Sequence, residues 1–334
     1  MDAIELGTVP KPSAGESEVL VEVRATGICG TDLTIYHGKF PEERARPPLV
    51  LGHEFAGTIA DVGKGVRGLK QGDPVVVDPL ISCGHCYSCT GGVPHLCTTL
   101  KLLGIDVNGS FAEYVVASAG RTYRMPSGMS FVEGAVVEPL SVAVHAVRRS
   151  ALNVGDRVLV TGGGPIGMLT ALVAKSAGAR MLVVTEIQGY RLETLKELGL
   201  QGFNPLEGDI KELVDLCFDG VGPDIVFEVT GTSAGMQQAI ECVRYRGTIV
   251  EVGLPKDRTE NDTRRVVFGE IAIIGSRVYA PVDIETSVGL LAGRKVDVKP
   301  LVKTFHLDEC PGLFQKLARG ESELIKAVFL IEEG

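Results

Sequence analysis

The sequence predicts a mixed α/β protein of two domains, a β-rich domain and a domain built on a doubly wound parallel sheet. Three observations favour this fold class. Short strand-like runs separated by glycine and proline fill the first third of the chain. After Asn153, strand-like and helix-like runs alternate, and a glycine-rich turn stands at the first strand-to-helix junction. The length of 334 residues also suits two domains better than one.

The expected strands of the first third are short and closely spaced. They cover residues 19–24, 55–62, 73–78 and 111–117. Such a density of short strands and turns predicts a compact barrel or sandwich. The end of the chain returns to mixed character, so we expect the tail to rejoin this first domain.

From residue 158 onward the pattern becomes that of parallel βαβ units. The expected strands are 158–161, 181–186, 224–229, 247–252 and 271–275, and the first two expected helices are 166–177 and 191–198. Strands that alternate with helices imply a parallel sheet with helices on both faces. This part of the chain is therefore predicted to be a Rossmann-type domain.

Composition and charge exclude several classes of function. Apolar residues make up 45% and charged residues 22%, an ordinary balance for a globular protein. The net charge of −9 argues against general binding to nucleic acids or anionic membranes. No apolar run is long enough to cross a bilayer, and the N-terminus lacks the blocks of a signal peptide. We therefore expect a cytoplasmic protein without nucleic-acid or membrane partners.

The glycine-rich turn indicates a dinucleotide site. Gly162, Gly164 and Gly167 form a G-x-G-x-x-G pattern between an expected strand and an expected helix, which Pro165 and Ile166 open. The first glycine permits the tight turn, the second lets the backbone approach a pyrophosphate, and the third lets helix and strand pack closely. The N–H groups at the start of the helix would then face the phosphates.

Glu186 indicates NAD as the dinucleotide. A carboxylate at the end of the second strand can accept hydrogen bonds from the adenosine ribose and would repel a 2′-phosphate. An exposed glutamate at a strand end is the alternative interpretation. Arg191 could argue for NADP, but its place inside the next expected helix makes it a weaker candidate for binding phosphate.

The loops that follow the later strands are expected to border the nicotinamide, because open α/β sheets bind ligands at the carboxyl ends of their strands. These loops contain Val229, Thr230, Gly253, Leu254, Ser276 and Arg277. Tyr36 and Tyr279 are weaker candidates for the substrate pocket, since simple packing explains each of them equally well.

Four of the eight cysteines indicate a structural zinc site. Cys83, Cys86, Cys89 and Cys97 stand within one loop. Four thiolates can close a tetrahedral shell around zinc and leave no position for a substrate. Two disulfides or four unrelated thiols are the alternatives, and a reducing compartment favours the metal. A zinc ribbon that binds nucleic acid is disfavoured by the acidic chain.

A second set of metal-binding residue types is dispersed along the chain. Cys29, His53 and Glu54 offer a thiolate, an imidazole and a carboxylate, and with one position left open they describe a catalytic zinc site. Spacing alone does not establish this site, because a lone buried cysteine or histidine is more often simply packed.

These motifs, in this order, resemble those of the zinc-containing medium-chain dehydrogenases over almost the whole chain. The motifs are Gly27-Ile-Cys-Gly-Thr-Asp32, Gly52-His-Glu54, the four-cysteine loop and the glycine turn. Within that family, residues 137–146 look most like sorbitol (polyol) dehydrogenases. Residues 185–193 resemble L-threonine 3-dehydrogenases at least as closely.

The resemblance implies roles for the dispersed residues. Cys29, His53 and Glu54 match the ligands of a catalytic zinc. Glu138 matches a carboxylate that approaches this metal directly or through water, and Thr31 matches the start of a proton relay. With the structural site, the resemblance implies two zinc ions per chain.

The resemblance also implies an architecture and an assembly. A GroES-like catalytic domain is expected at 1–145 and 278–334, around a Rossmann NAD-binding domain at 146–277. Members usually form homotetramers, so a homotetramer or homodimer is expected.

Two departures from the family pattern affect these expectations. Members often carry a histidine five residues after the first ligand cysteine, where this chain has Thr34. His37 or solvent is therefore expected to finish the relay. The chain also begins close to where the second strand of the family is expected, so a first strand is either absent or lost to a misassigned start codon.

The expected reaction is hydride transfer between a secondary alcohol, on a small polar substrate such as a polyol or sugar alcohol, and NAD. Zinc would lower the pKa of the substrate hydroxyl, and the nicotinamide would take the hydride. The near alternative is L-threonine 3-dehydrogenase, which should need an acidic group for the substrate ammonium. The distant alternative is a non-catalytic zinc- and nucleotide-binding protein.

Overall fold

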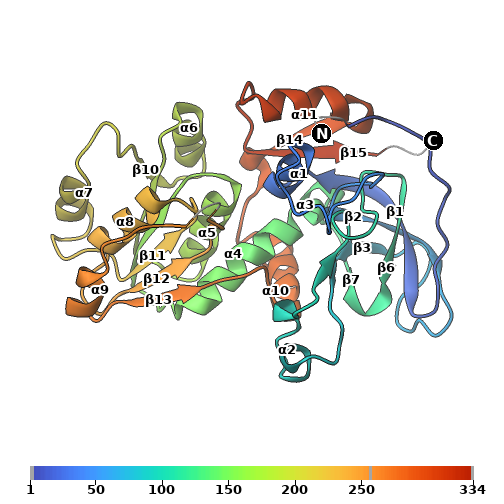
Figure 1. The fold of residues 1–334 in the computed structure, drawn as a ribbon, viewed down its shortest axis with the longest axis horizontal. Helices are drawn as coiled ribbons and strands as arrows, with labels where there is room; N and C mark the ends of the chain where they lie inside the picture. The colour runs from blue at the N-terminus through green and yellow to red at the C-terminus, as the bar shows by residue number, and fades with distance from the viewer. Residues whose placement is uncertain (1–3, 256–257, 332–334) are drawn as a thin grey trace. The chain divides into compact units, whose positions relative to one another are not determined.

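The computed structural model describes residues 4–255 and 258–331, and the chain divides into two compact units (Figure 1). The first unit comprises Met1–Glu138, Ala280–Ala292 and Leu301–Gly334. The second comprises Pro139–Tyr279 and Gly293–Pro300. The C-terminal segment thus joins the N-terminal segment in one unit.

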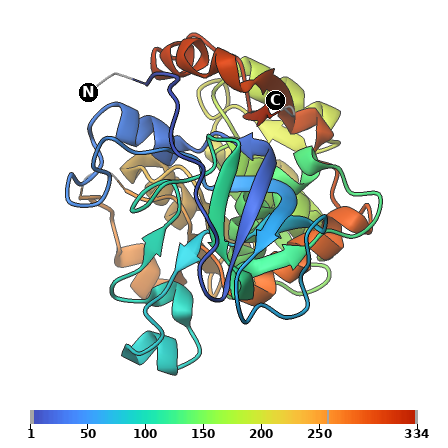
Figure 2. The same ribbon diagram turned by 90° about the vertical axis from the view of Figure 1, so that its right-hand side faces the viewer.

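The first unit is built on a seven-stranded sheet in the order β14-β15-β1-β2-β3-β7, with β6 also paired to β1. The strands are β1 (Glu18–Gly27), β2 (Glu54–Val62), β3 (Pro74–Val77), β6 (Tyr114–Ser118), β7 (Thr122–Arg124), β14 (Val302–His306) and β15 (Lys326–Leu330). Figure 2 shows the red C-terminal strands beside blue β1, in keeping with the antiparallel β1–β15 pairing. The tail therefore rejoins the first unit, as expected.

Short helices and a small hairpin complete the first unit. They are α1 (Gly30–Tyr36), β4 (Leu80–Ile81), α2 (Tyr87–Thr90), η1 (Pro94–Leu96), β5 (Lys101–Leu102), η2 (Ala119–Arg121), α3 (Phe131–Ala135), α10 (Pro281–Ala292), η4 (Leu307–Glu309) and α11 (Cys310–Ala318). Val19, Val21 and Val23 of β1 pack with Phe55 and Ile59 of β2 in one core cluster. Leu20 and Thr26 of β1 are buried as well, so this strand lies in the interior of the unit.

The second unit is a six-stranded parallel sheet in the order β10-β9-β8-β11-β12-β13. Its strands are β8 (Arg157–Thr161), β9 (Met181–Thr185), β10 (Gln201–Phe203), β11 (Ile225–Glu228), β12 (Thr248–Glu251) and β13 (Ala272–Gly275). Numbered within the unit, this is the order 3-2-1-4-5-6 of dinucleotide-binding domains. The strand order reverses between β8 and β11, where such sheets bind ligands.

Helices connect the strands of the second unit. They are α5 (Pro165–Ser176), α6 (Gly189–Glu197), α7 (Ile210–Cys217), α8 (Ser233–Cys242) and α9 (Arg264–Phe268). Two further elements span the division between the units, α4 (Val137–Ser150) and η3 (Lys299–Leu301). Within the described residues, no helix is both long and apolar enough to cross a membrane.

The expected elements agree with the structure except at some boundaries. The strand expected at 111–117 begins only at Tyr114. The peptide N–H groups of Ser110 and Phe111 instead donate to the carbonyls of Gly52 and Leu51, at 2.9 Å each. These hydrogen bonds hold residues 110–111 in a loop beside His53 rather than in β6.

Candidate metal and cofactor sites

Strand pairing brings the three dispersed metal-binding residues together. Gly27, the last residue of β1, pairs with Glu54, the first residue of β2. The chain continues from Gly27 to Cys29, which is the N-cap of α1, so its thiol lies beside His53 and Glu54. One ligand atom from each of these three side chains lies within 4.8 Å of the others. The cluster could hold one metal ion.

Asp32 lies beside two members of this cluster. Its carboxylate accepts a hydrogen bond from the Cys29 peptide N–H at 2.8 Å, which forms a capping box at the start of α1. Its other oxygen lies 3.7 Å from His53 Nδ1. A carboxylate behind a histidine orients the imidazole for a metal. Asp32 had no role assigned from the sequence, although it is the last residue of the motif at 27–32.

The charges around the cluster are those of a cation site. Burial alone would lower the pKa of His53, but negative charge on Asp32 and Cys29 holds it well above its usual value. Burial raises the pKa of the fully buried Asp32, with His53 opposing this. The acidic groups of this buried space are Asp32, Glu54, Glu138 and Cys29, and the basic ones are His53 and Lys326. A divalent cation would balance the excess of acidic groups.

Lys326 on β15 is the buried base of the site. Its ammonium donates to the Ile28 carbonyl at 2.8 Å and forms an ion pair with Glu54, with 5% of its side chain exposed. Burial lowers the pKa of Lys326, but Glu54 and Cys29 raise it more. No sequence signal identified this lysine, because it lies 298 residues from Ile28 and only the β1–β15 pairing joins them.

Glu138 and Thr31 lie at the edge of the cluster. Glu138 is the second residue of α4, is 7% exposed, and its charge raises the pKa of both His53 and Lys326. It is not one of the three residues whose ligand atoms lie within 4.8 Å. The Thr31 peptide N–H donates to Cys29 Sγ at 3.5 Å, which places this threonine beside the thiol.

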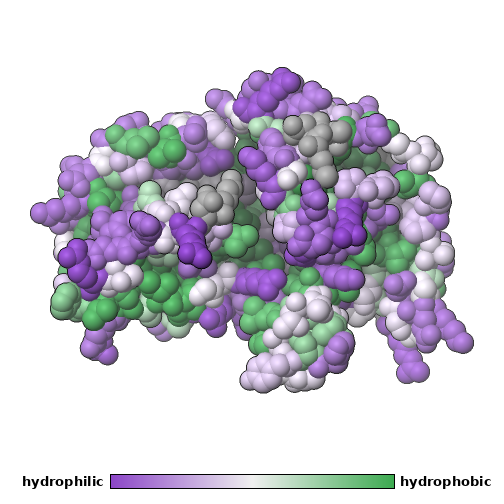
Figure 3. All heavy atoms as spheres, in the orientation of Figure 1, coloured by the Kyte–Doolittle hydropathy of each residue, from purple (hydrophilic) through white to green (hydrophobic). Residues whose placement is uncertain are grey.

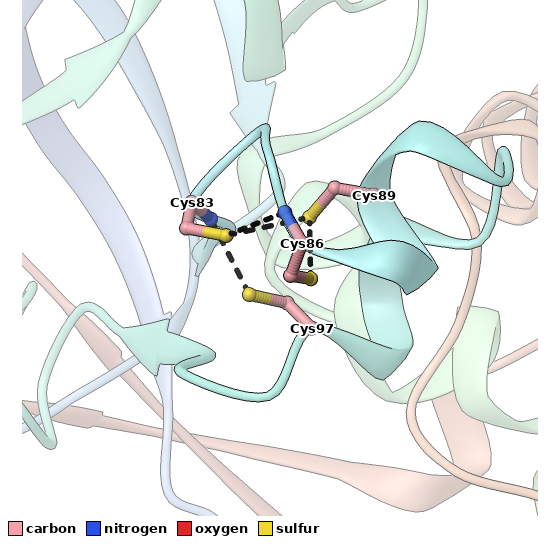
Figure 4. Close-up of side chains that lie close together, drawn as sticks. All are labelled: Cys83, Cys86, Cys89 and Cys97. Atoms are coloured by element: carbon pink, nitrogen blue, oxygen red, sulfur yellow. Dashed lines mark hydrogen bonds between the residues drawn. The ribbon is translucent and has the colours of Figure 1, made fainter.

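The four crowded cysteines form a separate cluster (Figure 4). The Cys89 sulfur lies 3.5 Å from that of Cys86 and 3.9 Å from that of Cys83. Sulfurs bonded to a tetrahedral zinc at about 2.3 Å lie about 3.8 Å apart, whereas disulfide sulfurs lie about 2 Å apart. The spacing therefore fits a shared metal ion, and all four cysteines are free.

Backbone N–H groups favour the thiolates of Cys86 and Cys97, whereas burial and the neighbouring Cys86 raise the pKa of Cys89 to about 11. The N–H groups of Cys89 and Thr98 lower the pKa of Cys86 to about 5. The N–H group of Cys83 lowers the pKa of Cys97 to about 7 and donates to its sulfur at 3.4 Å. The α2 helix between the cysteines buries none of its residues, so this lobe has little apolar core of its own. A metal would supply the missing stabilisation.

In the second unit, the glycine turn has the geometry that its pattern predicts. Gly162 has φ +98°, and a Cβ on Gly167 would overlap the Gly162 carbonyl oxygen. Gly164 is the N-cap of α5 without a side-chain cap, Pro165 occupies the first turn, and Ile166 follows. The start of α5 therefore presents its N–H groups to a ligand instead of to its own side chains.

Glu186 is held against this turn. One carboxylate oxygen accepts from the Gly163 N–H at 3.0 Å and pairs with Arg191 Nη1 at 3.2 Å. The other accepts from the N–H groups of Ile187 and Gln188. Arg191 belongs to α6 as expected, yet its side chain reaches back to the turn, where a Cβ on Gly164 would lie 3.8 Å from Nη1.

The later loops follow the carboxyl ends of β11, β12 and β13. Thr230 donates through both its N–H and its hydroxyl to buried Glu228, and Val229 N–H donates to Thr161. A Cβ on Gly253 would overlap the Gly231 amide, so these two loops touch. Ser276 N–H donates to Glu251, while Leu254 and Arg277 are exposed. Sequence reasoning overlooked Glu228, which organises its loop.

The weaker tyrosine candidates are both buried. Tyr279 is 0% exposed, and Tyr36 packs its ring against Phe314 with the centroids 5.8 Å apart. Two further histidines differ in their exposure. His85 is exposed between the cysteines, and His145 is buried on α4.

Comparison with known proteins identifies the family of the chain. Residues 15–127 match the alcohol dehydrogenase GroES-like domain, and residues 165–293 match the zinc-binding dehydrogenase domain. The chain is 40% identical over 293 residues to the 2-dehydro-3-deoxy-L-galactonate 5-dehydrogenase of Pseudoalteromonas atlantica, covering 88% of this chain and 85% of that one. The chain belongs to the zinc-containing medium-chain dehydrogenases. The predicted family and fold class are thereby confirmed.

Other members of this dehydrogenase family show similar coverage. The chain is 37% identical to the sorbitol dehydrogenase of Halalkalibacterium halodurans, covering 94% of this chain and 92% of that one. It is 35% identical to the L-threonine 3-dehydrogenase of Pyrococcus horikoshii, covering 98% and 95%. This chain is accordingly a zinc-dependent alcohol dehydrogenase of the family.

Solved structures of the family share the fold and differ in the dinucleotide they hold. A zinc-binding dehydrogenase from Sinorhizobium meliloti bound to NADP has a TM-score of 0.91 at 31% identity, covering 97% of this chain and 94% of that one. An alcohol dehydrogenase from Escherichia coli CFT073 complexed with NADH has a TM-score of 0.88 at 28% identity, covering 96% and 94%.

Proposed function

We propose that this dehydrogenase oxidises a secondary alcohol of a polyol or sugar-derived substrate with NAD, at a zinc ion held by Cys29, His53 and Glu54. The observation that carries the proposal is the cluster of one sulfur, one nitrogen and one oxygen ligand atom within 4.8 Å. Three protein ligands of this kind leave a position for substrate, which is typical of catalytic zinc.

The surrounding residues fit this ion. His53 Nδ1 faces Asp32, so Nε2 would be the ligand nitrogen. Zinc supplies Lewis-acid chemistry, because it lowers the pKa of a hydroxyl group that approaches it. Buried Glu138 would contact the ion directly or through water. The second zinc ion would be held by Cys83, Cys86, Cys89 and Cys97 and would have a structural role.

The substrate proton would leave through Thr31. Its hydroxyl belongs to the first turn of α1, which Cys29 caps. Thr34, one turn further on, donates its hydroxyl to the Gly30 carbonyl at 3.0 Å and offers no base. His37, at the end of α1, or solvent would therefore complete the relay.

NAD would bind the second unit along the carboxyl ends of the strands. Gly162, Gly164 and Gly167 let the backbone and α5 approach the pyrophosphate, and Glu186 would meet the adenosine ribose. NAD would supply the redox chemistry as the acceptor of the hydride. Residues in the later loops, from Val229 to Arg277, would border the nicotinamide.

The names of the relatives support a polyhydroxylated substrate and keep one alternative open. The sugar-acid and sorbitol dehydrogenases favour a polyol or sugar derivative. The L-threonine 3-dehydrogenases favour an amino acid. A substrate ammonium would need an acidic partner in the pocket.

We also propose a catalytic domain at 1–145 and 278–334, a Rossmann domain at 146–277, and a homotetramer or homodimer. Support for assembly comes from β13, which forms one edge of the second sheet. Val267 and Phe268 of α9 and Ile273 of β13 are exposed there, and Figure 3 shows apolar surface gathered over these elements. An open strand edge beside apolar side chains favours pairing with a second copy.

Metal analysis and a substrate panel test the proposed function. The wild-type chain should carry two zinc ions, and Cys29→Ala should carry one and lose alcohol oxidation. Cys217→Ala, which removes a thiol outside both clusters, should keep both zinc ions and the activity. Polyols, diols and L-threonine with NAD then separate the substrates. One zinc ion in the wild type, or no oxidation of any secondary alcohol, would overturn the proposal.

A further inference from the structure

The positively charged side chain of Lys326 lies beside Glu54, one of the proposed ligands of the catalytic metal. Lys326 Nζ pairs with Glu54 and donates to the carbonyl of Ile28, the residue before Cys29. One ammonium thus joins the segments that carry two proposed ligands. Both charged side chains are almost fully buried, with 5% of Lys326 and 2% of Glu54 exposed.

The fold makes room for this pair. Strand β1 lies between β15 and β2 in the sheet, so a side chain from β15 must cross β1 to reach Glu54. It crosses at Gly27, which has no side chain. A Cβ on Gly27 would overlap Glu54 Oε2 and lie 3.1 Å from Lys326 Cε. The glycine thus gives the lysine and the glutamate the space in which they meet.

We propose that Lys326 is a positioning residue that shares the Glu54 carboxylate with the catalytic metal and so limits how tightly that metal is held. This inference rests on the metal site of the proposed function. Without a metal, the ammonium is the cation that balances the buried carboxylates. With a metal, the same ammonium and the ion repel each other across a single carboxylate, where little water screens them.

Two roles of Lys326 predict opposite changes in the rate of metal loss when the lysine is removed. A lysine that served only as a scaffold would, when removed, loosen Glu54 and speed metal loss. A lysine that competes for Glu54 would, when removed, leave the carboxylate to the metal. Removal should then slow metal loss and destabilise the metal-free protein more than the metal-loaded one.

The test is metal release from Lys326→Met, which keeps the length of the side chain without its charge. The full chain is loaded with cobalt(II), because a site with four thiolates and a site with one thiolate absorb differently. After addition of a chelator, the one-thiolate signal should decay more slowly than in the wild type, on the order of tenfold. The four-thiolate signal serves as the internal reference.

Two variants act as controls. Lys326→Arg keeps the charge and should release metal at the wild-type rate. Lys303→Met removes an exposed lysine from the neighbouring strand β14, where Lys303 pairs in register with Ala327, and should also match the wild type. Lys326→Gln carries the test if Lys326→Met does not fold with metal, since it keeps a donor but no charge.

The outcomes separate this inference from the proposed function. A wild type that shows only the four-thiolate signal would overturn the proposed catalytic site itself. A wild type with both signals, together with uncharged Lys326 variants that release metal as fast as or faster than wild type, would overturn the inference alone. Slower release with a larger loss of thermal stability in the metal-free form would support it.

Discussion

Glu186 already has four donors around its carboxylate, and this bears on the choice of dinucleotide. Two backbone N–H groups hold one oxygen, while Gly163 N–H and Arg191 hold the other. A ribose diol must join this arrangement or displace part of it. Arg191 is the member that can move, because its guanidinium ends a flexible side chain that is 30% exposed.

Glu186→Ser should therefore change the preference between NAD and NADP. The variant removes the proposed ribose acceptor and releases Arg191, which could then pair with a 2′-phosphate. We expect the KM for NAD to rise by roughly ten- to a hundredfold, the cost of a hydrogen bond to a charged group, and the KM for NADP to fall. Steady-state kinetics with both dinucleotides measure this.

Glu193→Ser is the matched control for that change. Glu193 lies on the same helix α6 and is exposed, with a surface partner in Lys196. It should leave both KM values unchanged. An unchanged NAD-to-NADP ratio in Glu186→Ser would show that this carboxylate does not select the dinucleotide.

At the residue scale, local spacing predicted one cluster, the family resemblance pointed to the dispersed Cys29, His53 and Glu54, and two residues that depend on distant pairing were missed. The four cysteines stand in one loop, so their spacing alone predicts their cluster. Asp32 was missed because its contact with His53 exists only after β1 and β2 pair. Lys326 was missed because it reaches Glu54 across Gly27, and neither β15 nor its register with β1 can be read from residues near the site.

At the scale of elements, helix α5 approaches strand β8 so closely that one added methyl group would disturb the contact. A Cβ on Gly167 would overlap the Gly162 carbonyl oxygen, and that oxygen belongs to the turn itself. The backbone has no flexible side chain there that could move away. The helix must shift, and its N-terminal N–H groups shift with it.

Gly167→Ala should therefore weaken dinucleotide binding and lower the stability of the protein by about 1–3 kcal/mol, as overpacking does. Gly189→Ala is the matched control, because a Cβ on Gly189, at the start of α6, meets nothing within 4 Å. Thermal unfolding and titration with NADH, followed by nicotinamide fluorescence, measure both effects. Equal behaviour of the two variants would contradict the packing argument.

Prediction of the elements succeeded where hydrophobic pattern and tertiary structure agree. Strand β11 is buried along its length and β8 and β12 are buried except at their ends, and each expected run matches its strand within one or two residues. The boundary at Tyr114 could not be predicted, because residues 110–111 form backbone hydrogen bonds with the loop at 51–52. Such bonds between distant loops leave no periodic signal.

At the scale of the whole molecule, the sequence predicted which segments form each domain, but it did not predict where copies of the chain contact each other. Alternating strands and helices predicted the parallel sheet, and the mixed character of the tail predicted its return to the first unit. An interface between copies of the chain produces a weaker signal in the sequence. Apolar side chains of an exposed edge look like core residues in a sequence, and only the structure shows that Val267 and Phe268 are 74% and 79% exposed.

The edge of the second sheet should therefore decide the oligomeric state. Strand β13 pairs with β12 on one side, and within residues 4–255 and 258–331 its other side has no strand partner. Ile273 on this strand is 42% exposed. Two copies related by a two-fold axis could pair this edge with itself in an antiparallel manner and cover the apolar side chains of α9 and β13.

Ile273→Lys should reduce the assembly to a smaller species, because it places like charges on both copies at the shared edge and leaves the buried core untouched. Size-exclusion chromatography with light scattering gives the mass directly. Val154→Lys is the control, since Val154 is 87% exposed in the loop before β8 and adds the same charge away from the edge. A smaller mass for Ile273→Lys alone, with unchanged circular dichroism, would support the β13 interface. The same mass for both variants and the wild type would place the contact between copies elsewhere on the surface.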